Sequence, residues 1–268
     1  MDLFDLGTTS STLDPITVTS LMEIDEVLCE RVLVDTELTP KPLAPGSIPQ
    51  SSFFREDGLA RFSIRMASNE GHRNDASFLV RKMYGWRGYD TEPATSHPNC
   101  ITLIASMGDK ALATITVGFD SDVGLAVGNL YPEQVERLRA DGAHICEFTR
   151  LAVDRNKHSK ELLAMLFHVA YMYARRMNGK TDLLIEVNPR HVRFYNRMLG
   201  FRTLGPERIC PRVNAPAILM WLPLQYAEEQ IELHGGQRED SVGNRSLYPL
   251  FFSPVEEIGI TARLRAAG

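Results

Sequence analysis

Residues 145–154 constrain the fold of this chain more than any other segment. They read ICEFTRLAVD, an apolar run with a Glu, a Thr and an Arg where a buried strand would favour Val or Leu. A basic segment, RNKHSK at 155–160, comes next and precedes apolar residues at helical spacing. A strand, a cationic loop and a helix in this order can hold an anionic group at the helix N-terminus. The carboxylate on the strand is then placed to handle a proton.

The composition is that of an ordinary globular protein. Of the 268 residues, 44% are hydrophobic and 24% charged, which is enough for a sizeable core. The net charge of -5 argues against nucleic-acid or membrane binding through bulk charge. The four cysteines form no CxxC pair and the histidines no HExxH spacing, so we predict no metal site. No apolar run approaches the roughly 20 residues that span a bilayer, and the acidic start lacks a signal-peptide pattern. We therefore expect a cytoplasmic protein.

Hydrophobic periodicity in the middle of the chain predicts alternating strands and helices. The expected helices follow Asn69 and then occupy 131–139, 159–177 and 190–198. The expected strands occupy 61–67, 99–107, 110–119, 143–153, 182–187, 201–204 and 217–222. The second and third of these strands form a hairpin around a Gly-Asp turn. The pattern is that of an α/β protein with a mixed sheet.

Both ends of the chain differ from the middle. Residues 1–58 are rich in turn and linker residues, with helical spacing only at 21–34, so we expect an extension that is partly helical or flexible. Residues 223–268 form a second extension. In it, Ser253, Pro254 and Glu256 match a capping box with proline at the first helical position, which predicts a terminal helix.

Two motifs of the middle region resemble the GNAT acyltransferases. RLAVD at 150–154, with the basic turn and helix after it, is similar to the fourth strand and cofactor-binding turn of that superfamily. FYNRMLGF at 194–201 looks like its closing helix, and the upstream hairpin completes the order of elements. The resemblance covers residues 60–222. It implies a GNAT fold of the α/β (α+β) class: a mixed, mostly antiparallel sheet flanked by helices, at 59–222, between the two extensions.

The turn departs from the usual GNAT pattern. GNAT turns carry glycines that let backbone amides approach the pyrophosphate of coenzyme A, whereas residues 155–160 contain none. Instead the turn has four basic side chains, those of Arg155, Lys157, His158 and Lys160. A basic surface suits acyl carrier protein, an acidic protein that delivers a phosphopantetheine arm. Coenzyme A stays open as the donor, because Lys and Arg also bind phosphates.

Within the superfamily, the Glu-x-x-Arg pattern at 147–150 resembles acyl-homoserine-lactone synthases, which also lack the glycine turn. The chain looks closer to the N-acyl amino acid synthases, a family related to long-chain N-acyltyrosine synthases. The resemblance lies in YPE at 131–133, LR at 138–139, CEFTRLAVD at 146–154 and HVRFY at 191–195. It implies transfer of a medium- or long-chain acyl group from acyl carrier protein to the amine of an amino acid, with no bound cofactor.

Amide formation from a thioester needs the amine to lose a proton and the carbonyl to be polarised. We predict that Glu147 takes the proton; the alternative is a structural ion pair with Arg150 or another cation. In a regular strand Glu147 and Thr149 share one face and Arg150 lies on the other, so joint action requires a β-bulge. Arg150 then binds the acceptor carboxylate or steadies Glu147, or else forms a surface ion pair.

The remaining site residues are placed by the resemblance. Backbone amides near Leu151 and Val153 would polarise the thioester carbonyl beside a splay in the sheet. Tyr195 would protonate the leaving thiolate, or simply pack beneath the last helix. The first helix and its loop would contact substrate through Arg81, Tyr84 and Trp86.

Three other functions stay open at this point. An acyl-homoserine-lactone synthase would use S-adenosylmethionine as acceptor, but its N-terminal aromatic pattern is not clearly present. A coenzyme A-dependent N-acetyltransferase would bind acetyl-CoA tightly. A degenerate GNAT protein would bind an acyl chain or a carrier protein without turnover.

Overall fold

The computed structural model describes residues 62–68, 70–85, 99–154, 160–237 and 245–267. All of them lie in the second of the two units into which the chain divides, Glu37–Gly268. Extension boundaries at 58/59 and 222/223 are not decided by this division and stay predictions.

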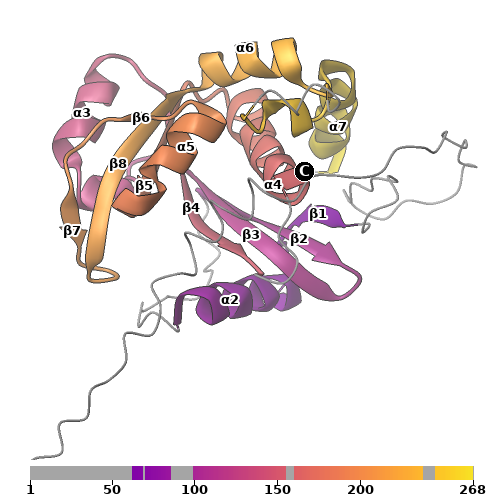
Figure 1. The fold of residues 1–268 in the computed structure, drawn as a ribbon, viewed down its shortest axis with the longest axis horizontal. Helices are drawn as coiled ribbons and strands as arrows, with labels where there is room; N and C mark the ends of the chain where they lie inside the picture. The colour runs from indigo at the N-terminus through magenta and orange to yellow at the C-terminus, as the bar shows by residue number, and fades with distance from the viewer. Residues whose placement is uncertain (1–61, 69, 86–98, 155–159, 238–244, 268) are drawn as a thin grey trace, which may run out of the picture. The chain divides into compact units, whose positions relative to one another are not determined.

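A mixed, mostly antiparallel sheet with helices on both faces forms the body of this unit (Figure 1), as the sequence predicted. The strands are β1 (Ser63–Met66), β2 (Cys100–Met107), β3 (Lys110–Phe119), β4 (Ile145–Val153), β5 (Asp182–Val187), β6 (Arg202–Thr203), β7 (Arg208–Cys210) and β8 (Ala215–Pro223). The helices are α2 (Glu70–Gly85), η2 (Ala126–Asn129), α3 (Pro132–Ala140), α4 (Lys160–Tyr171), η3 (Met172–Met177), η4 (Pro189–His191), α5 (Val192–Leu199), α6 (Leu224–His234), η6 (Tyr248–Leu250) and α7 (Pro254–Ala267).

Strand order in the sheet is β1-β2-β3-β4-β5-β8-β6, with β7 also paired to β8. All pairs are antiparallel except β4–β5, which are joined through α4 and η3 and run parallel. A βαβ connection is the usual way to make one parallel pair in such a sheet. The parallel pair therefore marks the middle of the sheet, with the β1–β3 meander on one side and β8 on the other.

Two apolar clusters lie on opposite faces of the central strands, because successive side chains of a strand alternate between faces. On one face, Cys146 and Phe148 of β4 join a large core with α4, α6 and α7. On the other, Ile145 joins a smaller core with η2 and α3. Helix α2 also covers this second face, where Leu79 and Val80 pack on Ala152. Figure 1 shows α2 on the side of the sheet opposite α4, α6 and α7.

Two irregularities occur in β4. Thr149 pairs with Thr116, but Ala152 pairs with Thr114, so β4 has one residue more than β3 over this stretch. This is the β-bulge that joint action of Glu147 and Arg150 requires. Pairing between β4 and β5 is also short. It covers only the first three residues of each strand and ends at Glu147 and Leu184, although both strands continue. The two strands therefore separate beyond Glu147.

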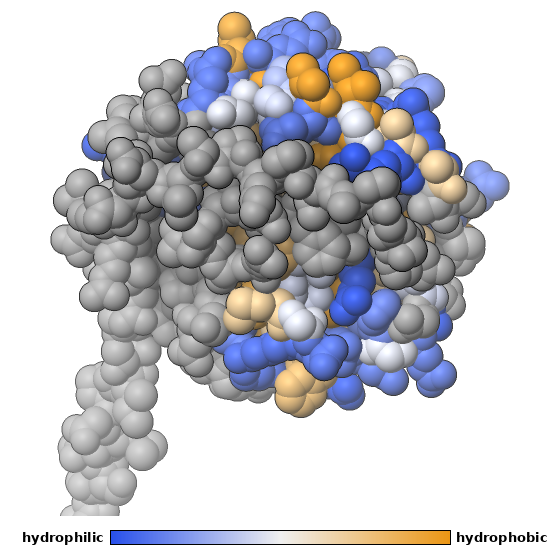
Figure 2. All heavy atoms as spheres, turned by 90° about the vertical axis from the view of Figure 1, so that its right-hand side faces the viewer, coloured by the Kyte–Doolittle hydropathy of each residue, from blue (hydrophilic) through white to orange (hydrophobic). Residues whose placement is uncertain are grey.

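The C-terminal segment packs into the main core. Leu224 of α6, Tyr248 of η6 and Leu264 of α7 are almost fully buried there. The predicted capping box is formed, since Ser253 N–H donates to Glu256 Oε2 at 2.8 Å. On the outer side, Leu233, Val255 and Ile258 are exposed, and Figure 2 shows apolar side chains gathered in the upper part of that view.

The structure differs from the sequence prediction in several places, including the 3-10 helix η2, which lies in a stretch where no helix was predicted. The helix expected at 159–177 changes to a π-helix from Met172 to Met177, which no apolar pattern signals. The short strand β7 was not predicted, because its Arg-Ile-Cys sequence is too short to show alternation. None of the described helices is both long and apolar enough to cross a membrane.

Candidate functional site

A row of polar and small residues crosses three strands on the face covered by α2 and η2. Cys100 pairs with Gly118, and Gly118 pairs with Glu147. One step along the same face, Thr102, Thr116 and Thr149 form a second cross-strand row. The Thr102 and Thr116 hydroxyls lie 2.9 Å apart and share a hydrogen bond. A polar strip inside an otherwise apolar sheet is unusual, which makes it the candidate site.

The carboxylate of Glu147 is at the centre of this strip. The residue is 5% exposed. Oε1 accepts the N–H of Ala126 and Oε2 accepts the N–H of Val127, both at 2.9 Å. These are the first amides of η2, which have no partner inside the helix. Glu147 is therefore held by backbone amides, and among the described residues no cation forms an ion pair with it. The structure shows no ion pair between Glu147 and Arg150, while the role of Glu147 as proton acceptor stays a prediction.

Burial raises the pKa of the Glu147 carboxyl above its usual range. The hydrogen bonds from Val127 and Ala126 and the charge of Arg212 oppose this shift, while nearby Glu186 adds to it. The result is a carboxylate that takes up a proton more readily than one in water does. Such a group suits a general base acting near neutral pH.

The β-bulge changes the position of Arg150. Its backbone has φ of 52°, in the left-handed region that residues with a side chain seldom adopt. The guanidinium lowers the pKa of the Cys100 thiol, which burial and Glu147 raise. Arg150 is therefore within electrostatic reach of the strip that contains Glu147, although a regular strand would place it on the opposite face.

Two tyrosines flank the part of β4 that has left β5. The hydroxyl of Tyr84 on α2 donates to the carbonyl of Leu151 at 2.7 Å. Tyr195 on α5 packs edge-on against Phe167 and Phe201. Burial and the proximity of Tyr84 raise the pKa of Tyr195, so its hydroxyl keeps its proton at neutral pH. A protonated phenol at this place can give a proton to a leaving group.

Backbone direction explains why amides of β4 are open beyond the bulge. The N–H of Asp154 donates to Leu112 of β3 at 2.7 Å. Since N–H groups alternate sides along a strand, the N–H of Val153 faces the other way, toward the space where β4 and β5 separate. Asp154 itself is buried and bonded by Lys82 of α2 and Lys110 of β3, at 3.4 and 3.6 Å. This end of β4 is thus fixed to two neighbouring elements.

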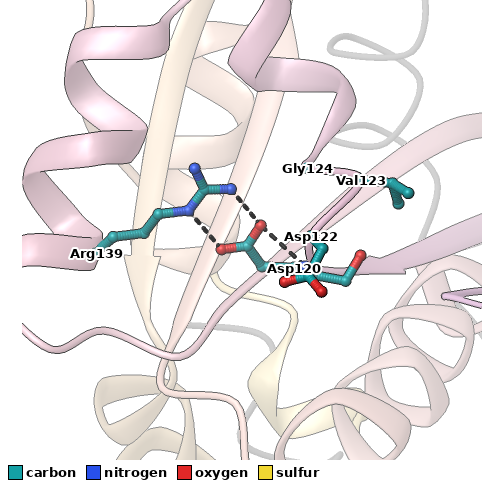
Figure 3. A pocket seen from close by; sticks show the side chains of 6 residues that line it. Asp120, Asp122, Val123, Gly124 and Arg139 are labelled. Carbon is teal, nitrogen blue, oxygen red and sulfur yellow. Dashed lines mark hydrogen bonds and ion pairs between the residues drawn. The ribbon is translucent and has the colours of Figure 1, made fainter.

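The segment that presents the amides to Glu147 is anchored by an ion pair. Arg139 of α3 donates to Asp120 through Nε at 2.8 Å and Nη2 at 2.6 Å. Figure 3 shows the planar fork of Arg139 meeting the Asp120 carboxylate at the edge of a pocket. This pocket, of about 470 Å³, is also lined by Ser121, Asp122 and Val123. Asp120 precedes η2 in the sequence and Arg139 follows it. Their ion pair therefore joins the two ends of the segment that contains Ala126 and Val127.

The structure places the other predicted residues as follows. Thr149 lies on the same face as Glu147. Leu151 and Val153 are half-buried against the core on the opposite face, so only their backbone is available to the splay. Arg81 is exposed on α2, and Lys160 is the first residue of α4. The predicted residues Trp86, Arg155, Lys157 and His158 lie outside the described residues.

Sequence reasoning missed Glu186 of β5 and Arg212 in the turn before β8. Arg212 Nη2 donates to Glu186 Oε2 at 2.6 Å. The available signal was a single Glu within the apolar strand Asp182–Val187, the same kind of anomaly that drew attention to Glu147. Among the described residues, no group of three or more His, Cys, Asp or Glu side chains is arranged to hold a metal ion.

Comparison with models of protein families shows which family the chain is related to. The model of the N-acyl amino acid synthase FeeM matches residues 75–223, more than half of the sequence. The chain belongs to the FeeM family of N-acyl amino acid synthases. The match runs from α2 to the end of β8, so it contains the polar strip, the bulge and both tyrosines. No curated protein sequence is a significant match to the chain.

The solved structure of FeeM agrees with this relationship. The structure of FeeM from uncultured soil microbes is 26% identical, with a TM-score of 0.57, and the alignment covers 62% of this chain and 92% of FeeM. An acyl-CoA N-acyltransferase from Pseudomonas aeruginosa is 13% identical, with a TM-score of 0.44, and the alignment covers 60% and 97%. The acyl-homoserine-lactone synthase LasI is 11% identical, with a TM-score of 0.45, covering 62% and 91%. This FeeM-family chain is an N-acyltransferase with a GNAT fold.

Proposed function

We propose that this FeeM-family protein transfers a medium- or long-chain acyl group from acyl carrier protein to the α-amine of an amino acid. The observation that carries the proposal is the position of Glu147. Its carboxylate is buried, held by two backbone amides, and placed beside the bulge and the separation of β4 from β5. A general base next to a slot for a thioester is the arrangement that aminolysis requires. The proposal keeps the cytoplasmic location expected from the sequence.

In the proposed reaction, the ammonium group of the acceptor gives one proton to Glu147. The free amine attacks the thioester carbonyl and a carbon–nitrogen bond forms. The oxyanion that develops is stabilised by the N–H of Val153, which faces the gap beside β4. The carbon–sulfur bond then breaks as Tyr195 donates its proton to the departing thiolate. The second proton of the former ammonium nitrogen passes to the Tyr195 phenolate, Glu147 releases the first proton to solvent, and the amide product and the carrier thiol leave. The positive charge of Arg150 binds the acceptor carboxylate.

The choice of acyl carrier protein as donor is supported by the sequence of the turn before α4. Residues 155–160 contain four basic side chains and no glycine. Such a turn disfavours close approach of backbone to pyrophosphate and favours an acidic protein partner. We expect neutralisation of Arg155, Lys157 and Lys160 together to weaken carrier binding and to flatten its dependence on salt. Unchanged affinity at low salt would exclude this turn as the docking surface.

A product screen tests the reaction itself. The purified protein is incubated with acyl carrier protein charged with chains of about C12–C16, a size that an apolar pocket can enclose, and with each amino acid in turn. Mass spectrometry should detect an N-acyl amino acid. Absence of any amide with all amino acids, while FeeM gives its product under the same conditions, would remove the proposal. Parallel reactions with acyl-CoA distinguish the two donors.

The role of Glu147 is tested by Glu147→Gln. A general base typically contributes about 10²- to 10⁴-fold to the rate, so turnover should fall by that order while carrier binding is retained. Glu232→Gln is the matched control, because Glu232 is an exposed carboxylate on α6. Retained turnover in Glu147→Gln would assign the proton transfer to another group.

A further inference from the structure

Glu186 faces the same side of the sheet as Glu147. In the parallel β4–β5 pair, Glu147 is opposite Leu184, and Leu184 packs in the core formed with η2 and α3. Side chains two residues apart on a strand share a face. Glu186 is therefore on that face, one step beyond the last β4–β5 pair, where the two strands have separated. Its charge contributes to raising the pKa of Glu147, which places the two carboxylates within electrostatic reach.

The two oxygens of Glu186 are in different situations. Oε2 accepts from Arg212 Nη2 at 2.6 Å and lies 3.7 Å from the thiol of Cys210. Oε1 is buried and has no hydrogen-bond partner among the described residues. Leaving a buried acceptor of a charged group unfilled is unfavourable by roughly 1–3 kcal/mol or more. By contrast, both oxygens of Glu147 are filled by backbone amides. Of the two carboxylates, Glu186 is the one that has an oxygen without a hydrogen-bond partner among the described residues.

The ion pair with Arg212 fixes the position of the Glu186 carboxylate. The side chain of Glu186 is 11% exposed, and its ion pair with Arg212 fixes one oxygen while the other has no hydrogen-bond partner among the described residues. The wider strip has charges of both signs, with Glu147 and Glu186 negative and Arg150 positive near Cys100. Separate negative and positive positions match the two ends of an amino acid zwitterion. An uncharged amine or an alcohol would offer Glu186 Oε1 no charged donor.

We propose that Glu186 Oε1 binds the α-ammonium group of the acceptor amino acid, with Arg212 as the positioning residue for that carboxylate. This inference rests on the proposed function and adds to it a subsite that selects cationic amines. Glu186 accepts a hydrogen bond from one N–H of the ammonium group but does not take its proton. Glu147 remains the group that removes the proton before attack.

Glu186→Gln is the informative variant, because glutamine keeps an oxygen for Arg212 but has no charge. The KM for the acceptor should rise roughly tenfold to a hundredfold, the contribution of one hydrogen bond to a charged group. The KM for the charged carrier protein should not change. Glu232→Gln, an exposed carboxylate on α6, is the matched control and should keep both values. An unchanged acceptor KM in Glu186→Gln would overturn the inference.

A competitive inhibitor separates binding of the ammonium group from a structural role. The α-hydroxy acid analogue of the acceptor has a hydroxyl in place of the amine. The wild-type protein should bind the amino acid more tightly than this analogue, and Glu186→Gln should lose most of that preference. A loss of thermal stability with the preference intact would assign Glu186 a structural role and overturn the proposal. Absence of any amide product from the wild-type protein is a different result, since it contradicts the proposed function before Glu186 is tested.

Discussion

Gly118 lies directly against the side chain of Glu147. A Cβ added at Gly118 would be 3.0 Å from Glu147 Cγ and 3.1 Å from Oε1. Contacts this short require the neighbour to move, and the carboxylate is the part that can. The close approach explains why glycine occupies this position near the end of β3, where a residue with a side chain would otherwise pack better.

We expect Gly118→Ala to displace the Glu147 carboxylate from the amides of Ala126 and Val127. A shift of this kind in a catalytic group reduces the rate by up to about a hundredfold, whereas overpacking of this size destabilises the fold by roughly 1–3 kcal/mol. Measurement of kcat/KM together with urea unfolding separates the two effects. Gly259→Ala is the control, since its nearest contact is 3.8 Å away on α7 and activity should not change. Full activity in Gly118→Ala would show that the exact position of Glu147 is unimportant.

The raised pKa of Glu147 predicts a pH dependence of the rate. Only the ionised carboxylate accepts a proton, so kcat/KM should fall as the pH drops through a value above the usual 4.5. The same shift has a consequence for stability. A carboxyl whose folded pKa is raised stabilises the fold fully below 4.5 and loses that contribution as pH rises through the folded pKa. Rate profiles of the wild type and Glu147→Gln check the assignment: the acid limb should disappear in the variant, and its persistence would point to another base.

The Asp120–Arg139 pair predicts an effect on activity from residues that do not touch the polar strip. A half-exposed ion pair contributes only about 0.2–1 kcal/mol to stability. If that energy mainly holds the η2 loop, Asp120→Asn should lower kcat by up to roughly fivefold with little change in unfolding free energy. Arg139→Gln should do the same, and the double variant should be no worse than either single variant because they break one interaction. Additive losses would mean that the two residues act separately.

How far the sequence predicts the site depends on whether a contact is local. The bulge was expected on the condition that Glu147 and Arg150 act together, because side chains three residues apart on a strand point to opposite faces. The capping box of Ser253 and Glu256 was also readable, since it involves residues three apart.

Contacts between distant segments were not predictable in this way. The amides that hold Glu147 belong to a loop about twenty residues upstream, as the pairs Ala126–Glu147 and Val127–Glu147 show. Backbone N–H groups are present at every residue except proline, so no sequence pattern marks the two that bind a carboxylate. The pairing of Glu186 with Arg212 likewise depends on where the β7–β8 turn packs. Only the folded sheet brings these groups together.

A buried network joins the C-terminal segment to α4 and η3. His168 on α4 is fully buried, and its Nδ1 accepts the N–H of Phe252 at 3.0 Å. Its Nε2 then carries the hydrogen and donates to Glu257 Oε2 of α7 at 3.0 Å. Glu257 Oε1 accepts from Arg176 Nε at 2.6 Å. Burial alone would raise the pKa of Glu257, but His168 and Arg176 lower it below its usual range.

Removing one member should therefore destabilise the whole acyltransferase unit. Breaking a buried pair typically costs about 3–5 kcal/mol, so Glu257→Ala should lower the unfolding free energy by that order. Glu232→Ala, an exposed carboxylate on α6, should stay within about 0.5 kcal/mol of the wild type. Chemical unfolding at pH 7.5 measures both. A small effect of Glu257→Ala would show that the C-terminal helix is held by its apolar contacts alone.

His168 adds a dependence on pH to this network. Burial lowers its pKa from the usual 6.5, against the opposing effect of Glu257. In the unfolded chain His168 becomes protonated near pH 6.5, whereas in the folded chain it stays neutral to a lower pH. The unfolding free energy therefore falls as the pH drops below about 6.5. One such group gives a slope of up to about 1.4 kcal/mol per pH unit. His168→Gln keeps a donor for Glu257 and an acceptor for Phe252 but does not titrate, so its unfolding free energy between pH 7 and 5 should change less steeply. Equal slopes in the two proteins would mean that His168 is not the group whose protonation opens the core.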